Sequence, residues 1–202
     1  MTSPGSIILA TLTAQTITNP RQTVVISDLW KNGPVVIKML RRFGCPLCRY
    51  EARVLSNYKS EFDRLNVKMI AIGFDEVGLD EWVKGKFWDG DLYMDPELNI
   101  YNHFGLKKMG LARGLLSLFS SDFSKKMKLA EKLGVGGNYT KGNGFIMGGT
   151  YVIDKGGKVL FEFKQENALE YPSLKSIIKA TGGNPDIVKL EDENHGTHPS
   201  KL

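Results

Sequence analysis

The sequence predicts an α/β domain built on a mixed β-sheet. Short apolar runs, typical of buried strands, alternate with segments whose apolar residues recur every three or four positions, as on one face of a helix. A strand–turn–strand pattern late in the chain adds antiparallel strands to an otherwise parallel order. The 202 residues, 42% of them hydrophobic, are enough to bury one compact core.

The N-terminal half begins with a hairpin and continues with strands and helices in alternation. The first thirty residues alternate loosely around an NPRQ turn and predict a β-hairpin. VVIKML, residues 35–40, is a continuous apolar run of the kind found in buried parallel strands. Helical spacing of apolar residues then predicts one long helix over residues 46–65. VKMIAIGF, residues 67–74, predicts a second buried strand.

Shorter elements complete the order. LDEWVKGKF predicts a short helix and LYMD a short strand. Asp95 suits an N-cap and Pro96 a first helical position, so PELNIYNHF predicts a helix that Gly105 ends. TYVID and KVLFEFK flank a Lys-Gly-Gly turn and predict a hairpin, and YPSLKSIIKATGG predicts the last helix.

One segment interrupts this order. Residues 107–148 hold a helix candidate at 122–133, followed by GVGGNYTKGNGFIMGG, in which seven of sixteen residues are glycine. So many glycines oppose regular structure, so we expect an insertion whose residues 134–148 form a mobile flap near the cysteines at positions 45 and 48. Residues 1–182 are then a single domain, and the polar residues 183–202 a loose tail.

The two cysteines of the chain, Cys45 and Cys48, lie in RRFGCPLCR, where the first buried strand meets the long helix. A helix N-terminus favours the thiolate over the thiol, and Arg41, Arg42 and Arg49 bring positive charge close in sequence. Cys48 is one helical turn on, so its sulfur can reach back. The pattern predicts a dithiol in which an exposed Cys45 attacks and a more buried Cys48 resolves.

Other interpretations of the cysteine pair stay open at this point. A zinc site needs four ligands, and His103, His195 and His198 lack the spacing of a zinc module, so we expect no metal. The pair is also compatible with two small buried hydrophobes at a strand–helix junction.

Charge and hydropathy exclude several classes of protein. The net charge is +5, but the lysines and arginines are scattered along the chain. The sequence shows no nucleic-acid-binding module. No stretch approaches the ~20 apolar residues of a membrane span. The N-terminus lacks the basic region of a signal peptide, so we expect a soluble intracellular protein.

With this motif in place, the chain resembles the thioredoxin-like superfamily and, within it, the peroxiredoxin-like, AhpC/TSA-related group that includes prostamide/prostaglandin F synthase. The resemblance covers about residues 20–182 and is most specific in RRFGC-x-x-CR and FGLKK. It implies a thioredoxin-like fold: a central mixed sheet flanked by helices, with an N-terminal β-hairpin and a helical, Gly-rich insertion.

Two positions depart from more distant members of the superfamily. Ordinary peroxiredoxins carry Thr or Ser where this chain has Arg42, and thioredoxins carry a cis-proline where it has Gly148-Gly149-Thr150. Both departures are typical of the synthase-like group.

The resemblance implies reduction of a lipid endoperoxide, prostaglandin H2 or its ethanolamide, to the F-type product through Cys45 and Cys48. NADPH is the implied electron source. The chain shows no Rossmann glycine motif, so either NADPH binds unconventionally or thioredoxin delivers the electrons. The alternatives are a thioredoxin-dependent thiol peroxidase for lipid or alkyl hydroperoxides, and a non-catalytic binding protein that uses the dithiol as a redox switch.

Several residues around the dithiol are candidates for binding substrate or stabilising the thiolate. Arg41 and Arg42 suit a substrate carboxylate, although solvated strand-end arginines explain them equally well. His103 suits a packing role better than that of a base. Trp82, Phe87 and Trp88 are either core or pocket wall. The full candidate set is Arg41, Arg42, Phe43, Gly44, Arg49, Gly149 and Thr150.

The sequence ends in Ser200-Lys201-Leu202, a tripeptide read by the peroxisomal import receptor. We expect a cytosolic protein with at least partial peroxisomal import. The last twelve residues fused to a fluorescent protein should give punctate fluorescence that becomes diffuse when the final three are deleted. Diffuse fluorescence from both fusions would contradict the expectation.

Overall fold

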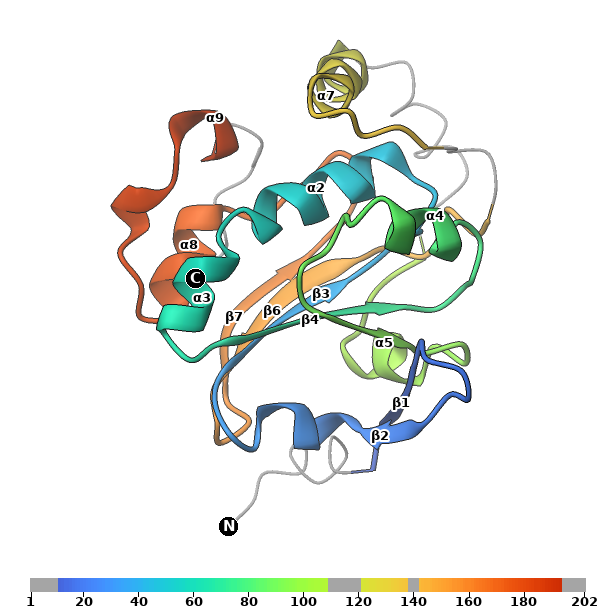
Figure 1. Ribbon diagram of the computed structural model, residues 1–202, viewed down its shortest axis with the longest axis vertical. Coiled ribbons are helices and arrows are strands. Elements are labelled where there is room, and N and C mark those ends of the chain that lie inside the picture. The colour runs from blue at the N-terminus through green and yellow to red at the C-terminus, as the bar shows by residue number, and fades with distance from the viewer. Residues whose placement is uncertain (1–10, 109–120, 138–141, 194–202) are drawn as a thin grey trace.

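The predicted mixed sheet is present in the computed structural model, which describes residues 11–108, 121–137 and 142–193. Its seven strands lie in the order β2-β1-β5-β4-β3-β6-β7 (Figure 1). The central β3, β4 and β5 run parallel, and the predicted hairpins join antiparallel on either side, β1 against β5 and β6 against β3. The strands are β1 (Thr13–Thr16), β2 (Thr23–Val25), β3 (Val35–Met39), β4 (Lys68–Gly73), β5 (Asp91–Met94), β6 (Gly149–Ile153) and β7 (Val159–Lys164).

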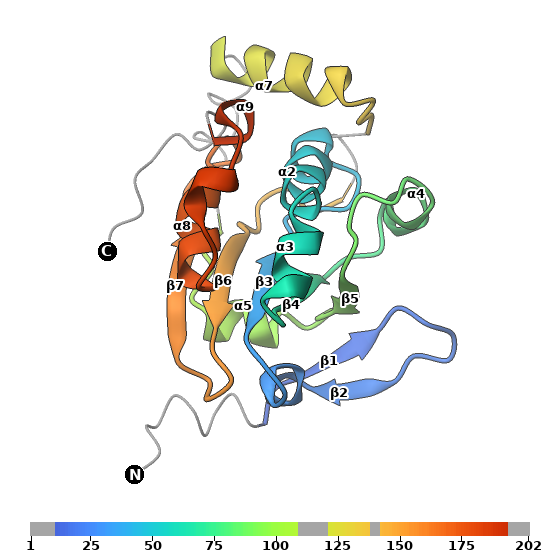
Figure 2. The same ribbon diagram turned by 60° about the vertical axis from the view of Figure 1, so that its left-hand side comes forward.

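Helices cover both faces of the sheet. Figure 2 shows α2, α3 and α8 on one face and α5 on the other, with α7 across the end of α2. The helices are α2 (Pro46–Ser56), α3 (Lys59–Arg64), α4 (Leu79–Lys84), α5 (Asn99–His103), α7 (Ser121–Lys132), α8 (Leu174–Ala180) and α9 (Leu190–Glu193), with short 3-10 turns η1 (Ile26–Trp30) and η2 (Pro185–Ile187).

The central strands are buried on both faces, which explains their continuous apolar sequences. Alternate residues of β3 enter two separate cores: Val36 packs with α2 and α8, whereas Val35 and Ile37 pack with α5. One charged residue, Lys38, interrupts the apolar run of β3. Its side chain is nevertheless buried, with only 1% of the residue exposed.

The predicted long helix is wrong in one respect: it is two helices. The backbone tightens at the end of α2, where the N–H of Tyr58 donates to Leu55 O at 3.2 Å instead of to the residue four positions back. The Tyr58 hydroxyl donates to the Asp192 carboxylate at 2.6 Å, which holds the break in place. Both helices bury residues on the same side, so the apolar spacing continues through the break.

The predicted helix after Asp95 also starts later than its sequence suggests. Leu98 adopts a left-handed conformation with φ 60°, and α5 begins at Asn99. Asp95 still caps the helix, because its carboxylate accepts from the N–H groups of Asn99, Ile100 and Tyr101 at 2.8–3.2 Å. Gly105, at φ +65°, ends the helix as predicted.

The first part of the predicted loose tail is packed. Val188 is 5% exposed, and Glu193 accepts hydrogen bonds from Ser173 Oγ at 2.6 Å and Lys175 N at 3.1 Å. The Glu193 carboxylate therefore satisfies a backbone N–H at the N-terminus of α8. Its negative charge also interacts favourably with the positive end of the helix dipole.

Some sequence predictions lie outside the described residues. These are residues 1–10 of the hairpin region, the start of the insertion at 109–120, part of the expected flap at 138–141, and residues 194–202 with two histidines and the terminal tripeptide. Within the described residues, no helix combines the length and hydropathy needed to cross a bilayer.

Candidate active site

The two cysteines lie at the junction between β3 and α2. Cys45 is the N-cap of α2, with φ −76° and ψ 122°, and Pro46 is the first helical residue. Proline suits that position because its missing N–H would have no partner there. Cys48, one turn on, donates a side-chain hydrogen bond to Cys45, and both thiols are free. The geometry is that of a dithiol one step from a disulfide.

The predicted exposure of Cys45 is wrong. Cys45 is 4% and Cys48 5% exposed, so neither sulfur is the more accessible. The insertion covers them, because α7 packs on α2 and its Ala130 joins the same apolar cluster, as does Val135 beyond it. Sequence reasoning expected a flap near the dithiol but not the packing of α7 on α2, because residues of these two helices are at least 65 positions apart in the sequence.

The two thiols have opposite protonation tendencies. The hydrogen bond from Cys48, and after it the charges of Arg41 and Arg42, hold the pKa of Cys45 well below its usual range despite burial. The hydrogen bond to Cys45, burial and the charge on Cys45 raise the pKa of Cys48. The difference in pKa favours ionisation of Cys45 over Cys48, the order expected of an attacking and a resolving cysteine.

Arg41 is a buried cation beside the thiolate. It is 4% exposed, and its Nη2 donates to Gly144 O of the insertion at 2.9 Å. In the described part of the chain no carboxylate lies within ion-pair distance of it. A buried guanidinium needs a compensating charge, and the Cys45 thiolate supplies one.

Arg42 is half-buried and contacts the same loop. A Cβ added to Gly144 would lie 3.1 Å from Arg42 Cζ, so the guanidinium crosses this glycine closely. Arg42 thus lies between the dithiol and the insertion rather than free in solvent.

Arg49 acts as a clamp. Its Nε donates to Phe43 O at 2.7 Å, Nη1 to Gly136 O at 2.8 Å and Nη2 to Glu81 at 2.8 Å, while its guanidinium lies 4.9 Å from the centre of the Phe87 ring. These bonds join the cysteine turn to the insertion and to α4. They commit the side chain to positioning the turn.

Phe43 and Gly44 shape the turn in different ways. Phe43 is 1% exposed and packs edge-on to Trp82 at 5.4 Å, so it belongs to the core. Gly44 meets the insertion: a Cβ on Gly137 would lie 2.4 Å from Gly44 O, and only glycine permits this approach. Phe87 and Trp88 are 8% exposed and, like Trp82, belong to the core cluster, although Trp82 and Trp88 also line a groove beside β1.

Gly149 and Thr150 lie on β6, paired with Met39 and Lys38 of β3, the strand that precedes the cysteine turn. Thr150 is fully buried, and its Oγ1 accepts from Lys38 Nζ at 3.4 Å. His103, at the far helix α5, contacts the Phe104 ring edge-on, which fits a packing role. The described residues contain no cluster of His, Cys, Asp or Glu able to hold a metal ion.

Four polar residues near the site were missed at the sequence level. Lys38 forms a short ion pair with Glu51 inside the core. Tyr171 is nearly fully buried, and its hydroxyl donates to Leu47 O at 3.4 Å. Lys126 of α7 donates to Leu169 O, and its Nζ lies 3.9 Å from the centre of the Tyr171 ring. A lysine inside an apolar strand was the one available signal.

Comparison with known proteins places the chain in a family. A sequence model of the family described as AhpC/TSA antioxidant enzyme matches residues 54–167. Prostamide/prostaglandin F synthase of Aquarana catesbeiana is 34% identical over 194 residues, covering 93% of this chain and 94% of that protein. The Bos taurus protein of the same name is 33% identical over 167 residues, with 82% and 83% covered.

Solved structures agree on the fold. Peroxidoxin BcpB from Mycobacterium tuberculosis superposes with a TM-score of 0.56 at 18% identity, covering 88% of this chain and 94% of that one. A putative thiol:disulfide interchange protein DsbE from Chlorobium tepidum gives a TM-score of 0.52 at 15% identity, with 85% and 93% covered.

The fold and site define a thioredoxin-like thiol oxidoreductase of the peroxiredoxin-like class. The chain belongs to the AhpC/TSA antioxidant enzyme family, as its sequence predicted, and the prostamide/prostaglandin F synthases are relatives along most of its length.

We predict that Cys45 ionises at lower pH than an ordinary thiol. Only the thiolate alkylates readily, so the pH curve for iodoacetamide labelling of Cys45 should lie below that of free cysteine. Cys48→Ala removes the largest cause and should shift the curve furthest upward, followed by Arg41→Met and then Arg42→Ala. A wild-type curve matching free cysteine would contradict an activated nucleophile.

We predict that Gly137→Ala lifts the insertion from the dithiol, because the added Cβ would meet Gly44 O at 2.4 Å. Gly136→Ala is the matched control, since a Cβ there meets nothing within 4 Å. Labelling of Cys45 by a bulky maleimide should accelerate roughly 5- to 30-fold in Gly137→Ala, the factor for about 1–2 kcal/mol of lost closure. Equal rates in both variants would show that this contact does not control access.

Proposed function

We propose that the protein reduces a lipid endoperoxide, prostaglandin H2 or its ethanolamide, to the F-type diol through Cys45 and Cys48. The observation that carries the proposal is the hydrogen bond between two free cysteines, which lowers the pKa of Cys45 and raises that of Cys48. The names of the relatives above support the substrate class. The apolar cluster around both sulfurs suits a lipid better than a polar peroxide.

The reaction balances with one thiolate, one thiol and one proton from solvent. The Cys45 thiolate attacks one oxygen of the O–O bond, which breaks; a sulfur–oxygen bond forms and the other oxygen leaves as an alkoxide that takes a proton. Cys48 then attacks Cys45, the sulfur–oxygen bond breaks, and the second alkoxide is protonated. The substrate gains two electrons and the enzyme forms the Cys45–Cys48 disulfide.

Arg41 and Arg42 have two tasks in this scheme. Their charges favour the thiolate before attack. They also lie where negative charge develops on the departing oxygen, and fixed charges aimed at such a site stabilise the transition state. Arg49, with its donors committed, holds the turn in place.

NADPH is the ultimate electron donor in this proposal, and a thioredoxin-type dithiol carries the electrons to the disulfide. The glycines at 136 and 137 support a carrier, since they contact Arg49 and Gly44 rather than forming a phosphate-binding turn after a strand.

A second candidate is a thioredoxin-dependent thiol peroxidase for lipid or alkyl hydroperoxides. The fold shared with peroxidoxin BcpB favours it. A panel of prostaglandin H2, a lipid hydroperoxide and hydrogen peroxide separates the candidates when each is assayed with NADPH, with and without thioredoxin and its reductase. Failure to reduce any of them would leave the dithiol as a non-catalytic redox switch.

We predict that Cys45→Ser abolishes turnover, because in the described residues Cys48 is the other thiol and its pKa is raised. Cys48→Ser should still react once and then hold Cys45 as a sulfur–oxygen adduct or sulfenic acid, seen as a mass increase. Full activity in Cys45→Ser, or multiple turnovers in Cys48→Ser, would overturn the mechanism.

A further inference from the structure

The first step of the proposed reaction produces a strongly basic leaving group. When the Cys45 thiolate attacks one oxygen of the O–O bond, the other oxygen departs as an alkoxide, whose conjugate acid is about as weak an acid as water. An alkoxide leaves faster when a positioned group gives it a proton in the transition state. Cys45 is 4% exposed, so solvent has little access to the place where that proton is needed.

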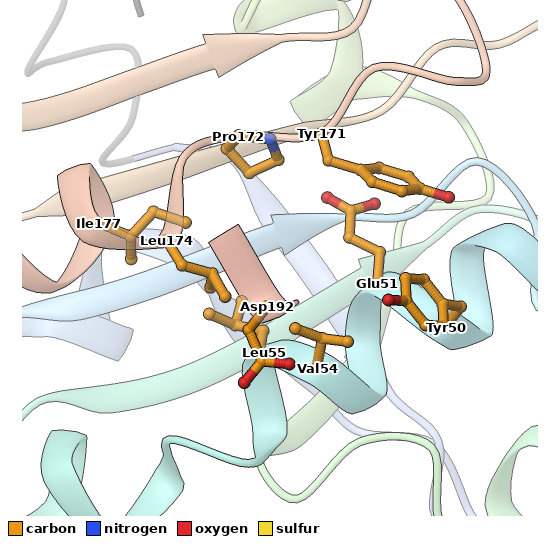
Figure 3. A pocket seen from close by; sticks show the side chains of 9 residues that line it. All are labelled: Tyr50, Glu51, Val54, Leu55, Tyr171, Pro172, Leu174, Ile177 and Asp192. Atoms are coloured by element: carbon orange, nitrogen blue, oxygen red, sulfur yellow. The ribbon is translucent and has the colours of Figure 1, made fainter. Parts of the chain in front are cut away.

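Tyr171 carries a hydroxyl group to the first turn of α2. The residue is 3% exposed and belongs to the same apolar cluster as Cys45 and Cys48. Its hydroxyl donates to the carbonyl oxygen of Leu47, the residue directly before Cys48, at 3.4 Å. Figure 3 shows the Tyr171 ring beside the Glu51 carboxylate, which belongs to the same helix as Cys48. The phenol therefore lies against the turn that holds both sulfurs.

The hydrogen bond to Leu47 leaves the Tyr171 proton available. At 3.4 Å it is longer than the ~2.7–2.8 Å typical of a bond between two oxygens. Tyr101, another buried tyrosine, differs, because its single hydroxyl proton lies between Leu40 O at 2.6 Å and Ile72 O at 2.7 Å. The Tyr171 hydroxyl can turn toward a bound molecule without losing a strong bond.

The charges around Tyr171 suit a proton donor. Burial, and after it the charges of Glu51 and the two cysteines, raise the pKa of Tyr171, so the phenol keeps its proton until a strong base forms nearby. The charge on Cys45 leaves the sulfur as the sulfur–oxygen bond forms, so the phenol becomes more acidic when the alkoxide appears. Lys126 Nζ lies 3.9 Å from the ring centre, and a positive charge at that distance favours the phenolate that remains.

We propose that Tyr171 is the catalytic acid of the first step and gives its proton to the oxygen that departs when Cys45 cleaves the O–O bond. In this step the sulfur–oxygen bond forms, the O–O bond breaks, and the proton moves from the phenol to the departing alkoxide. The proton that Cys48 releases in the second step restores the phenol, and solvent protonates the second alkoxide.

This inference rests on the proposed function and narrows the class of substrate. A proton donor beside Cys45 serves substrates whose leaving group is an alkoxide, such as endoperoxides and alkyl hydroperoxides. It gives no advantage with a disulfide, because a thiolate leaves without a proton.

The test varies the basicity of the leaving group while Cys45 attacks a peroxide oxygen in every case. Reduced protein is mixed with prostaglandin H2, tert-butyl hydroperoxide or peracetic acid and quenched with acid at set times. The remaining thiols are then alkylated, and mass spectrometry measures the loss of unreacted dithiol, which reports the first step. The first two reagents release an alkoxide, whereas peracetic acid releases acetate, a weak base that needs no proton.

Tyr171→Phe removes the proton and keeps the ring. The first step with prostaglandin H2 or tert-butyl hydroperoxide should slow about 100-fold, the lower end of the effect of a positioned acid, while the step with peracetic acid should stay within about twofold of wild type. Tyr151→Phe is the matched control. Within the described residues the Tyr151 hydroxyl is also buried and has no hydrogen-bond partner, but it lies in the other core, with α5. This control should react with all three reagents at the wild-type rate.

The pattern across the reagents decides between the inference and the proposed function. Equal slowing of Tyr171→Phe with all three would assign Tyr171 to structure, and no slowing with any would show that another group supplies the proton; either result overturns the inference. Normal reaction of Tyr171→Phe with prostaglandin H2 would keep the proposed function and reject Tyr171. Slowing with tert-butyl hydroperoxide, in a protein that does not react with prostaglandin H2, would support Tyr171 and reject the endoperoxide. A wild-type protein that reacts with peracetic acid alone would overturn both.

Discussion

The hydrogen bond from the Cys48 thiol to Cys45 forms because β3 ends where α2 begins, with proline as the first helical residue. It places one sulfur at the helix N-terminus and the other one turn along the same face. Neighbouring charges then act unequally on the two sulfurs: Arg41 and Arg42 favour the thiolate on Cys45, whereas Cys48 feels the charge of Cys45 and of Glu51. The chemical asymmetry of the pair comes from position, since the two side chains are identical.

A second constraint is the close cover over this pair. The insertion reaches the cysteine turn through backbone contacts, with Arg49 bound to Gly136 O and Arg41 bound to Gly144 O. Both arginines donate to carbonyls within the expected flap, residues 134–148. Arg41, whose charge favours the thiolate, therefore also holds its cover. Any movement of this cover away from the cysteine turn would have to break the hydrogen bonds of these two guanidinium groups.

Local signals in the sequence predicted most strands, the helix start at Pro46 and the residues of the dithiol turn. These features depend on neighbours within a few positions, as with the Gly105 stop after α5. The sequence-based predictions were wrong where contacts between distant residues determine the structure. The helix breaks at Tyr58, whose hydroxyl binds Asp192 far along the chain, and Cys45 is buried where α7 packs on α2. Periodicity contains no information about either contact.

The site was predicted in part for the same reason. The cysteines and Arg41 follow the end of β3 within a few residues, so the motif RRFGCPLCR identified them. The Lys38–Glu51 pair joins a strand to a helix thirteen residues away, and its lysine is hidden in an apolar run. Arg49 was grouped with the thiolate-stabilising arginines, yet its donors bind Phe43, Gly136 and Glu81.

The burial of both sulfurs, 4% and 5% exposed, has a consequence for the durability of the enzyme. A sulfenic acid is damaged when a second peroxide oxidises it to the sulfinic form, a reaction that depends on exposure. Here the partner thiol is already in contact, while a second oxidant would have to pass the insertion. Closure is intramolecular and independent of peroxide concentration, whereas damage rises with it. The covered dithiol thus favours survival through many cycles in an oxidising environment.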